Sequence, residues 1–199
     1  LAYTDKAFPT IGGLTTSAPS VIAEMIFNAG LKSGDKVLEI GTGTGYEAAV
    51  LAEMGVKVFT IEIDKQTAEK ANRILVNLGY KIDKQLKNKQ RRKDGIKRFN
   101  RIKTYFLNRE KIELYWGNGR NGLEEYSPFK GIIVAASIPN INDIKNLVSQ
   151  LSPKRGRLVV PVGSRYEQTL HIIERQTDKV HLSILEGVTF NFIRMVKKE

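Results

Sequence analysis

Apolar residues in the first eighty positions follow two kinds of spacing. Runs rich in β-branched and aromatic residues, at 36–41 and 57–63, predict short strands. Each run is followed by apolar residues three or four positions apart, over 46–54 and 67–78, and this spacing predicts helices that close near a glycine. Two successive strand–helix units predict a parallel sheet with right-handed crossovers.

Another helix is expected before the first strand. Ser17 is its expected N-cap, Pro19 lies in its first turn and Gly30 ends it. The helix would bury one apolar stripe, formed by Val21, Ile22, Met25 and Ile26.

The second half of the chain continues the alternation of strands and helices and then ends in consecutive strands without a helix between them. Three further strands are expected, with a helix over 142–151 before the third, and the chain closes with two strands joined by a tight turn. We therefore expect an α/β fold, a Rossmann-like three-layer α/β/α sandwich whose sheet is mostly parallel, with antiparallel C-terminal edge strands. These five strands lie at 111–117, 131–137, 156–163, 168–176 and 179–190.

Composition narrows the class of protein. The chain has 199 residues, 41% of them hydrophobic, which suits a single globular domain over 1–199 that buries roughly 70% of its unfolded surface. No apolar run approaches the roughly 20 residues that span a bilayer, and the first ten residues do not resemble a signal peptide, so we expect a cytoplasmic protein without a membrane partner. The absence of Cys excludes disulfides, thiolate zinc sites and a Cys nucleophile.

The net charge of +11 is concentrated in one segment. Residues 81–111 hold 13 Lys and Arg against 3 Asp and Glu, a charge of +10, which leaves +1 for the rest. This segment, at about 81–110, is expected to be an insertion between the second strand–helix unit and the next strand. Apolar residues at Ile96, Phe99, Ile102 and Phe106 suggest an amphipathic helix with a basic outer face. Because the insertion leads into a parallel strand, we expect it at the amino edge of the sheet, away from a ligand at the carboxyl edge.

A glycine-rich turn follows the first expected strand. Gly41, Gly43 and Gly45 would let the backbone approach a ligand, and the next helix offers free N–H groups. Glu62, 21 residues after Gly41 at the end of the next strand, is placed to accept hydrogen bonds from ribose hydroxyls. Tyr46 occupies a position where dinucleotide-binding turns need a small residue, and no G-K-[ST] motif is present. The glycine turn and Glu62 together predict an adenosine-type ligand. Tyr46 disfavours NAD, and the missing G-K-[ST] motif disfavours ATP.

The motif Glu39-x-Gly41-x-Gly43-x-Gly45 resembles the first motif of class I S-adenosylmethionine-dependent methyltransferases. Four longer stretches, beginning at Ala2, Leu31, Trp116 and Leu151, resemble the protein-L-isoaspartate O-methyltransferase family in order and spacing. The resemblance covers most of 2–163 apart from the basic segment. It implies one class I methyltransferase domain, S-adenosyl-L-methionine as cofactor and isoaspartyl proteins or peptides as substrates.

The resemblance also implies roles for individual residues. Ser17 would orient the reacting carboxylate as the catalytic residue, while Thr16, Ala135 and Ala136 would contact the substrate. The cofactor would be bound by Thr15, Glu39, Gly41, Thr42, Gly43, Gly45, Glu62, Ile63, Asn118 and Gly119. Leu14 and Asn118 differ from the family pattern, which has a Gln and an Asp there.

The chemistry needs few residues. A carboxylate with a pKa near 4 is ionised at neutral pH, so its attack on a sulfonium methyl group requires no general base. No His, Asp or Glu cluster has metal-ligand spacing, and we expect no metal. His171 and His181, on the last two strands, are expected to be structural.

Three functions remain open, besides methylation of another small-molecule or protein carboxyl group. The leading hypothesis is methylation of the free carboxylate of L-isoaspartyl residues in damaged proteins, which starts their repair. An RNA methyltransferase anchored through 84–107 is less favoured, since the chain lacks the Asn/Asp-Pro-Pro-aromatic motif of amino-directed enzymes. A non-catalytic homologue that binds a cofactor or partner is the third. A monomer is favoured over an oligomer.

Overall fold

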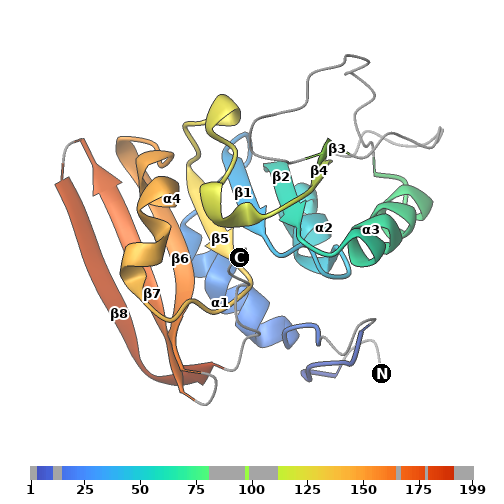
Figure 1. Cartoon of the computed structure of the whole chain (residues 1–199), viewed down its shortest axis with the longest axis horizontal. Coiled ribbons are helices and arrows are strands. Elements are labelled where there is room, and N and C mark those ends of the chain that lie inside the picture. Colours follow the sequence, from blue (N-terminus) through green and yellow to red (C-terminus); the bar gives the residue numbers. More distant parts are fainter. Residues whose placement is uncertain are drawn as a thin grey trace.

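The computed structural model describes residues 4–10, 15–80, 97–98, 112–164, 167–177 and 179–190. Its strands form one eight-stranded sheet in the order β3-β4-β2-β1-β5-β6-β7-β8 (Figure 1). The elements are α1 (Pro19–Ala29), β1 (Lys36–Ile40), α2 (Tyr46–Glu53), β2 (Lys57–Glu62), α3 (Lys65–Asn77), β3 (Lys97–Arg98), β4 (Ile112–Trp116), β5 (Gly131–Val134), α4 (Lys145–Ser149), β6 (Lys154–Gly163), β7 (Gln168–Gln176) and β8 (Lys179–Phe190), with the 3-10 helices η2 (Gly119–Asn121), η3 (Glu124–Tyr126) and η4 (Ile141–Ile144).

The centre of the sheet is parallel, as predicted. β1 pairs with β2 on one side and with β5 on the other, so that Val37 lies opposite both Val58 and Gly131. The chain builds outward from β1 to β2 and β4 and then crosses to β5 and β6. β1 and β5 therefore flank the point where the strand order reverses, and ligands of open α/β sheets bind there, outside the carboxyl ends of the strands.

The C-terminal strands are antiparallel, as predicted. β6 pairs with β7, and β7 pairs with β8. The turn between β7 and β8 contains Thr177, which has a positive φ of 55°. Together with the parallel centre, this arrangement confirms the predicted mixed sheet.

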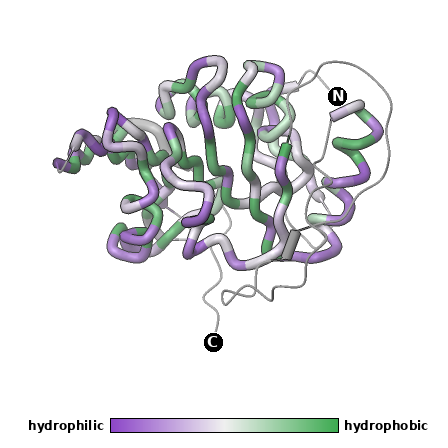
Figure 2. Tube along the Cα trace, turned by 90° about the horizontal axis from the view of Figure 1, so that it is seen from above, coloured by the Kyte–Doolittle hydropathy of each residue, from purple (hydrophilic) through white to green (hydrophobic). Residues whose placement is uncertain are grey.

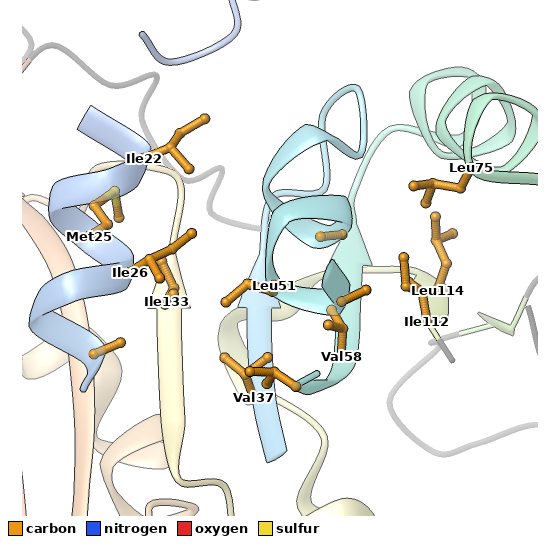
Figure 3. Close-up of a cluster of buried hydrophobic side chains, with 14 of the residues drawn as sticks. Ile22, Met25, Ile26, Val37, Leu51, Val58, Leu75, Ile112, Leu114 and Ile133 are labelled. Carbon is orange, nitrogen blue, oxygen red and sulfur yellow. The ribbon is translucent and has the colours of Figure 1, made fainter. Parts of the chain in front are cut away.

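Helices cover both faces of the sheet. One face packs against α1, α2 and α3 through a core whose members are seen in Figure 3, among them Met25, Leu51, Leu75, Val37, Val58, Leu114 and Ile133. The other face packs against α4 and the 3-10 segments through Leu38, Ile61, Tyr115, Phe129, Ile132, Leu147 and Val160. Strands buried on both faces read as continuous apolar runs, and all four residues of β5 are buried.

Apolar residues concentrate along the middle of the molecule, and polar residues gather on loops and outer turns (Figure 2). In the described part of the chain, no helix is both long and apolar enough to cross a membrane.

The beginning of α1 differs from the prediction. Its N-cap is Ala18 rather than Ser17, and no side chain of its own closes that end. The carboxylate of Asp5 instead accepts the backbone N–H of Ser20 at 2.9 Å. This hydrogen bond lowers the pKa of Asp5. The cap comes from a residue 15 positions away, and helix-local rules could not identify it.

Two other helices also differ from the prediction in their boundaries. α3 begins at Lys65, two residues before the expected Thr67, because the Asp64 carboxylate accepts the Thr67 N–H at 2.8 Å and caps the helix. The helix expected over 142–151 is divided into η4 and the short α4. Asn140 caps η4 by accepting the Asn142 N–H at 2.9 Å.

The basic segment is described only at Lys97 and Arg98. These residues form β3, antiparallel to the end of β4, with Lys97 opposite Trp116 and Arg98 opposite Tyr115. The helix prediction is therefore wrong at these two positions, and Ile96, Phe99, Ile102, Phe106 and most of 84–107 lie outside the described residues. The expectation that the insertion stays at the amino edge is also wrong, because β3 reaches the carboxyl end of β4. The connection that enters β4 predicted only the amino edge, whereas the antiparallel pairing of β3 with β4 depends on the tertiary structure.

Candidate active site

The glycine turn after β1 requires glycine at three positions. Gly41, Gly43 and Gly45 have φ values of 101°, 54° and 85°, a region that other residues rarely adopt. The Gly41 N–H donates to the Ile61 carbonyl of β2 at 2.8 Å. The turn is thus fixed to the neighbouring strand and leads directly into α2.

The space around the three glycines differs. A Cβ on Gly41 would lie 3.3 Å from the Ala135 carbonyl oxygen, and a Cβ on Gly45 would lie 3.1 Å from the Leu75 side chain. A Cβ on Gly43 would meet nothing within 4 Å. Gly41 and Gly45 therefore serve close packing, whereas Gly43 borders open space where a ligand can approach the backbone.

Glu62 is joined to this turn. The side chain is buried, with 4% of its surface exposed, and its Oε2 accepts the Gly43 N–H at 2.9 Å. Its Oε1 accepts the Asp64 N–H at 3.0 Å. A carboxylate has about four acceptor positions, so each oxygen keeps acceptor capacity beyond these two bonds. The arrangement suits the recognition of a ribose diol beside the glycine turn.

Ile63 and Trp116 extend this part of the site. The Ile63 side chain is 45% exposed, and its carbonyl accepts the Trp116 indole N–H at 3.1 Å. The Lys65 ammonium lies 5.5 Å from the centre of the indole ring. No role was expected for Trp116 from the sequence, although its place just before Gly117-Asn118-Gly119 was a usable signal.

The Asn118–Gly119 segment lies against the end of β1. Asn118 Oδ1 accepts the Arg120 N–H at 3.1 Å and thereby caps η2. A Cβ on Gly119 would lie 2.5 Å from the Ile40 side chain, so only glycine permits this approach. The structure brings Asn118 and Gly119 to the same edge of the sheet as Gly41.

Thr42 points into the protein. It is buried, and its hydroxyl lies 2.5 Å from the Thr60 hydroxyl. The expected contribution of Thr42 to ligand binding is therefore limited to its backbone.

The N-terminal candidates lie on a segment folded back on itself. Thr16 donates its N–H to the Phe8 carbonyl at 2.8 Å, and its hydroxyl accepts the Phe8 N–H at 3.0 Å. Thr15 forms an isolated bridge with Pro9. Ser17 follows directly, and because it does not cap α1, its hydroxyl has no role in starting the helix.

The direction of α1 places Ser17 at the ligand edge. The Arg157 side chain, near the start of β6, donates to the Asn28 carbonyl at 3.4 Å, so α1 ends at the amino edge of the sheet. Since α1 packs along β5 and β6, its beginning lies toward their carboxyl ends. Ala135 and Ala136 follow β5 at that edge, and the Ala135 N–H donates to the Ile40 carbonyl at 2.8 Å.

Comparison with known proteins identifies the family. The family model described as protein-L-isoaspartate(D-aspartate) O-methyltransferase matches residues 1–199. The protein-L-isoaspartate O-methyltransferase of Cytophaga hutchinsonii is 34% identical over 198 residues, which cover 100% of this chain and 74% of the relative. That of Gloeobacter violaceus is 36% identical over 176 residues, 88% of this chain and 70% of the relative. The chain belongs to the protein-L-isoaspartate(D-aspartate) O-methyltransferase family.

Solved structures agree on the fold. A protein-L-isoaspartate O-methyltransferase structure matches with a TM-score of 0.74 at 24% identity, over 98% of this chain and 54% of that one. A Plasmodium falciparum protein assigned to the same methyltransferase group, solved in complex with S-adenosyl-L-homocysteine, matches with a TM-score of 0.68 at 21% identity, over 100% of this chain and 83% of that one. The class I methyltransferase fold predicted from the sequence is confirmed.

Membership of the isoaspartate methyltransferase family also confirms the predicted enzyme class, and the Plasmodium falciparum structure has S-adenosyl-L-homocysteine bound to the same fold. The residue assignments stay predictions, although the structure gathers Gly41, Gly43, Glu62, Asn118 and Gly119 at one edge of the sheet. Leu14 lies outside the described residues. Among the described residues, no group of three or more His, Asp or Glu is arranged to hold a metal ion.

Glu39, which the family resemblance assigns to cofactor binding, is buried near the end of β1. It is 1% exposed, and neither of its carboxyl oxygens has a hydrogen-bond partner among the described residues. Glu47, which the sequence argument overlooked, is 5% exposed with its Oε1 also unpartnered. Burial raises the pKa of Glu39 well above its usual range, and the neighbouring Glu47 carboxyl raises it further. Burial raises the pKa of Glu47 to about 8.

Proposed function

We propose that this chain uses the site at the carboxyl ends of β1, β2 and β4 to transfer the methyl group of S-adenosyl-L-methionine to the free carboxylate of L-isoaspartyl residues in proteins. The observation that carries the proposal is the bond between Glu62 and Gly43. It joins an acid suited to a ribose with a turn whose backbone borders open space. An adenosine-type ligand fits both.

The donor would be held by groups of three kinds. Gly41, Gly43 and Gly45 supply a turn that brings backbone close to the ligand, and Glu62 supplies acceptors for the ribose. Asn118 and Gly119 lie beside the turn, where the adenine is expected, and Ile63 offers an exposed apolar side chain for its ring. When bound, S-adenosyl-L-methionine supplies an electrophilic methyl group on a sulfonium.

The protein has little chemistry of its own to perform. The substrate carboxylate is already ionised at neutral pH, so no side chain has to remove a proton. The remaining task is to hold the attacking oxygen in line with the methyl group, and such positioning contributes roughly 7–11 kcal/mol to rate acceleration. This accounts for a site in which the assigned residues other than Glu39 and Glu62 are glycines, alanines, residues with hydroxyl groups, Asn118 and Ile63.

Ser17 is the residue we assign to orient the substrate carboxylate. Its hydroxyl is a hydrogen-bond donor of the right kind, and it lies on the segment between the Phe8–Thr16 bonds and α1. Thr16 would hold that segment in place rather than touch the substrate through its hydroxyl, since the hydroxyl accepts the Phe8 N–H. Ala135 and Ala136 leave space for the substrate backbone.

All residues that we assign to the site belong to a single chain. We therefore propose that the protein acts as a monomer. Light scattering coupled to size-exclusion chromatography tests this, and a mass near twice 22.4 kDa would contradict it.

The activity is tested with labelled S-adenosyl-L-methionine and three acceptors. An isoaspartyl peptide, its normal aspartyl counterpart and a tRNA are incubated separately with the protein. We expect base-labile label on the isoaspartyl peptide alone, because a methyl ester hydrolyses in base. Label on tRNA that survives base would support the RNA-methyltransferase alternative and contradict the proposal. Equal labelling of the two peptides would contradict isoaspartyl specificity.

A further inference from the structure

Two buried carboxyl groups lie at the two ends of the glycine turn, and methyl transfer to an ionised carboxylate requires no proton exchange with either. Glu39 is the next-to-last residue of β1, just before the turn, and Glu47 is the second residue of α2, just after it. They are 1% and 5% exposed. Both oxygens of Glu39 and Oε1 of Glu47 lack a hydrogen-bond partner in the part of the chain that the structure describes.

The surroundings of the pair oppose full ionisation. Burial and the Glu47 carboxyl of α2 raise the pKa of Glu39 most, the Thr60 hydroxyl of β2 lowers it, and Glu62, also on β2, raises it. None of the ion pairs seen among the described residues includes Glu39 or Glu47. Two buried carboxyl groups close together cannot both carry a charge at low cost, so they retain a proton between them.

We propose that Glu39 and Glu47 form a proton-sharing pair that responds to the charge of the molecule in the cofactor site. The pair keeps its proton when the site is empty or holds the neutral thioether product, and it releases one proton to solvent when the cationic sulfonium donor binds. This inference rests on the proposed function, because it assumes that the site beside the glycine turn binds the donor.

The physical reason is the difference of one positive charge between donor and product. A positive charge within about 4–6 Å of a carboxyl group lowers its pKa by about 1–3 units. In a buried place this attraction is little screened by water or salt. Burial raises the pKa of both carboxyl groups. The pair is therefore protonated at neutral pH and can release a proton when the donor binds.

A functional consequence follows for turnover. Because proton release accompanies donor binding, affinity for the donor should rise with pH up to about pH 8, by as much as tenfold per unit for one released proton. Affinity for the product should rise less steeply. The pair would thus favour replacement of the spent product by a fresh donor.

Titration calorimetry tests the inference directly. The whole chain is titrated at pH 7 with S-adenosylmethionine or S-adenosylhomocysteine, in two buffers of different ionisation enthalpy, which gives the number of protons released. We expect the donor to release roughly 0.4–0.9 proton more than the product, as follows from a pKa of about 8 for Glu47 lowered by about 1–3 units. An equal proton count for the two ligands would overturn the inference.

Two variants assign the proton to the pair. The double variant Glu39→Gln, Glu47→Gln keeps side-chain size and is expected to release equal numbers of protons with both ligands. Glu47→Gln alone should remove part of the difference in proton release between the donor and the product. The exposed Glu167 provides the control, since Glu167→Gln should behave as the unchanged protein. An undiminished difference in the double variant would also overturn the inference.

A measurement without ligand separates this inference from the proposed function. A carboxyl group whose pKa is raised on folding contributes stability that is complete below its unfolded pKa and is lost as pH rises through its folded pKa. The unchanged protein should therefore lose stability relative to the double variant between about pH 5 and pH 8. If the difference in stability between the unchanged protein and the double variant did not vary with pH, the inference of a proton-sharing pair would be overturned. Failure of both ligands to bind would overturn the proposed function instead.

Discussion

The carboxylate of Glu62 accepts the backbone N–H of Gly43 at 2.9 Å, although the two residues belong to different strand–turn units. The bond fixes the end of β2 against the turn that follows β1. The same carboxylate accepts the Asp64 N–H, so both of its oxygens are oriented before any ligand arrives. A preorganised acceptor of this kind limits the ordering cost of binding.

Replacement of Glu62 should therefore weaken cofactor binding. In Glu62→Gln one oxygen becomes an amide NH2, which would face a backbone N–H and could not accept from a ribose hydroxyl. Hydrogen bonds to charged groups contribute about 1.5–3 kcal/mol, so we expect the Kd for S-adenosylhomocysteine to rise about 10- to 100-fold. Calorimetry measures this, with Glu167→Gln as control. An unchanged Kd would remove Glu62 from the binding site.

Gly43 and Gly34 offer a matched pair for testing the turn. Both have positive φ values, 54° and 86°, and a Cβ on either would meet nothing within 4 Å. Each change to Ala should cost about 1–2 kcal/mol of stability through backbone strain alone. Only Gly43→Ala should also weaken cofactor binding, because its Cβ enters the space beside Glu62. Denaturant unfolding and calorimetry separate the two effects, and equal affinities in the two variants would show that Gly43 does not face the ligand.

Ser17→Ala should separate binding from catalysis. The hydroxyl is assigned to the substrate carboxylate, so cofactor affinity should stay unchanged while kcat for an isoaspartyl peptide falls roughly 10- to 100-fold, the effect of losing one hydrogen bond to a charged group. Ser149→Ala, on the exposed side of α4, is the control. If Ser17→Ala turns over at the original rate, the orienting group lies elsewhere.

Trp116 provides a spectroscopic test of where the cofactor binds. It is the sole tryptophan of the chain, and its indole N–H donates to the carbonyl of Ile63, next to Glu62. Addition of S-adenosylhomocysteine should change its fluorescence emission, and Trp116→Phe should abolish that signal. In Glu62→Gln the same change should need about 10- to 100-fold more ligand. Saturable binding seen by calorimetry with no change in emission would place the ligand away from this edge.

The basic segment shows how far local reasoning reaches. The charge pattern predicted an insertion at about 81–110, and its place in the fold was inferred from chain connectivity alone. β3 pairs with the end of β4, opposite Tyr115 and Trp116, and only the completed sheet reveals this pairing. The pairing brings part of the insertion to the ligand edge.

Long-range side-chain contacts were equally hidden from the sequence. The Asp5 cap of α1 and the Glu39–Glu47 pair join residues through tertiary packing. Glu47 reads as an ordinary helix residue, and the burial that changes its protonation comes from surrounding elements. Trp116 was likewise an unassigned aromatic residue until its bond to Ile63 was visible.

The sequence by itself determined the order of strands and helices outside the basic segment, the turn at Gly41–Gly45 and the acid that follows it, because apolar periodicity and the freedom of glycine act over a few neighbouring residues. Only the tertiary structure decided which groups lose water and which meet. Glu62 became a fixed acceptor and Glu39 a buried acid because the sheet sets the distances between strands and the helices close over them, and no local pattern encodes those distances.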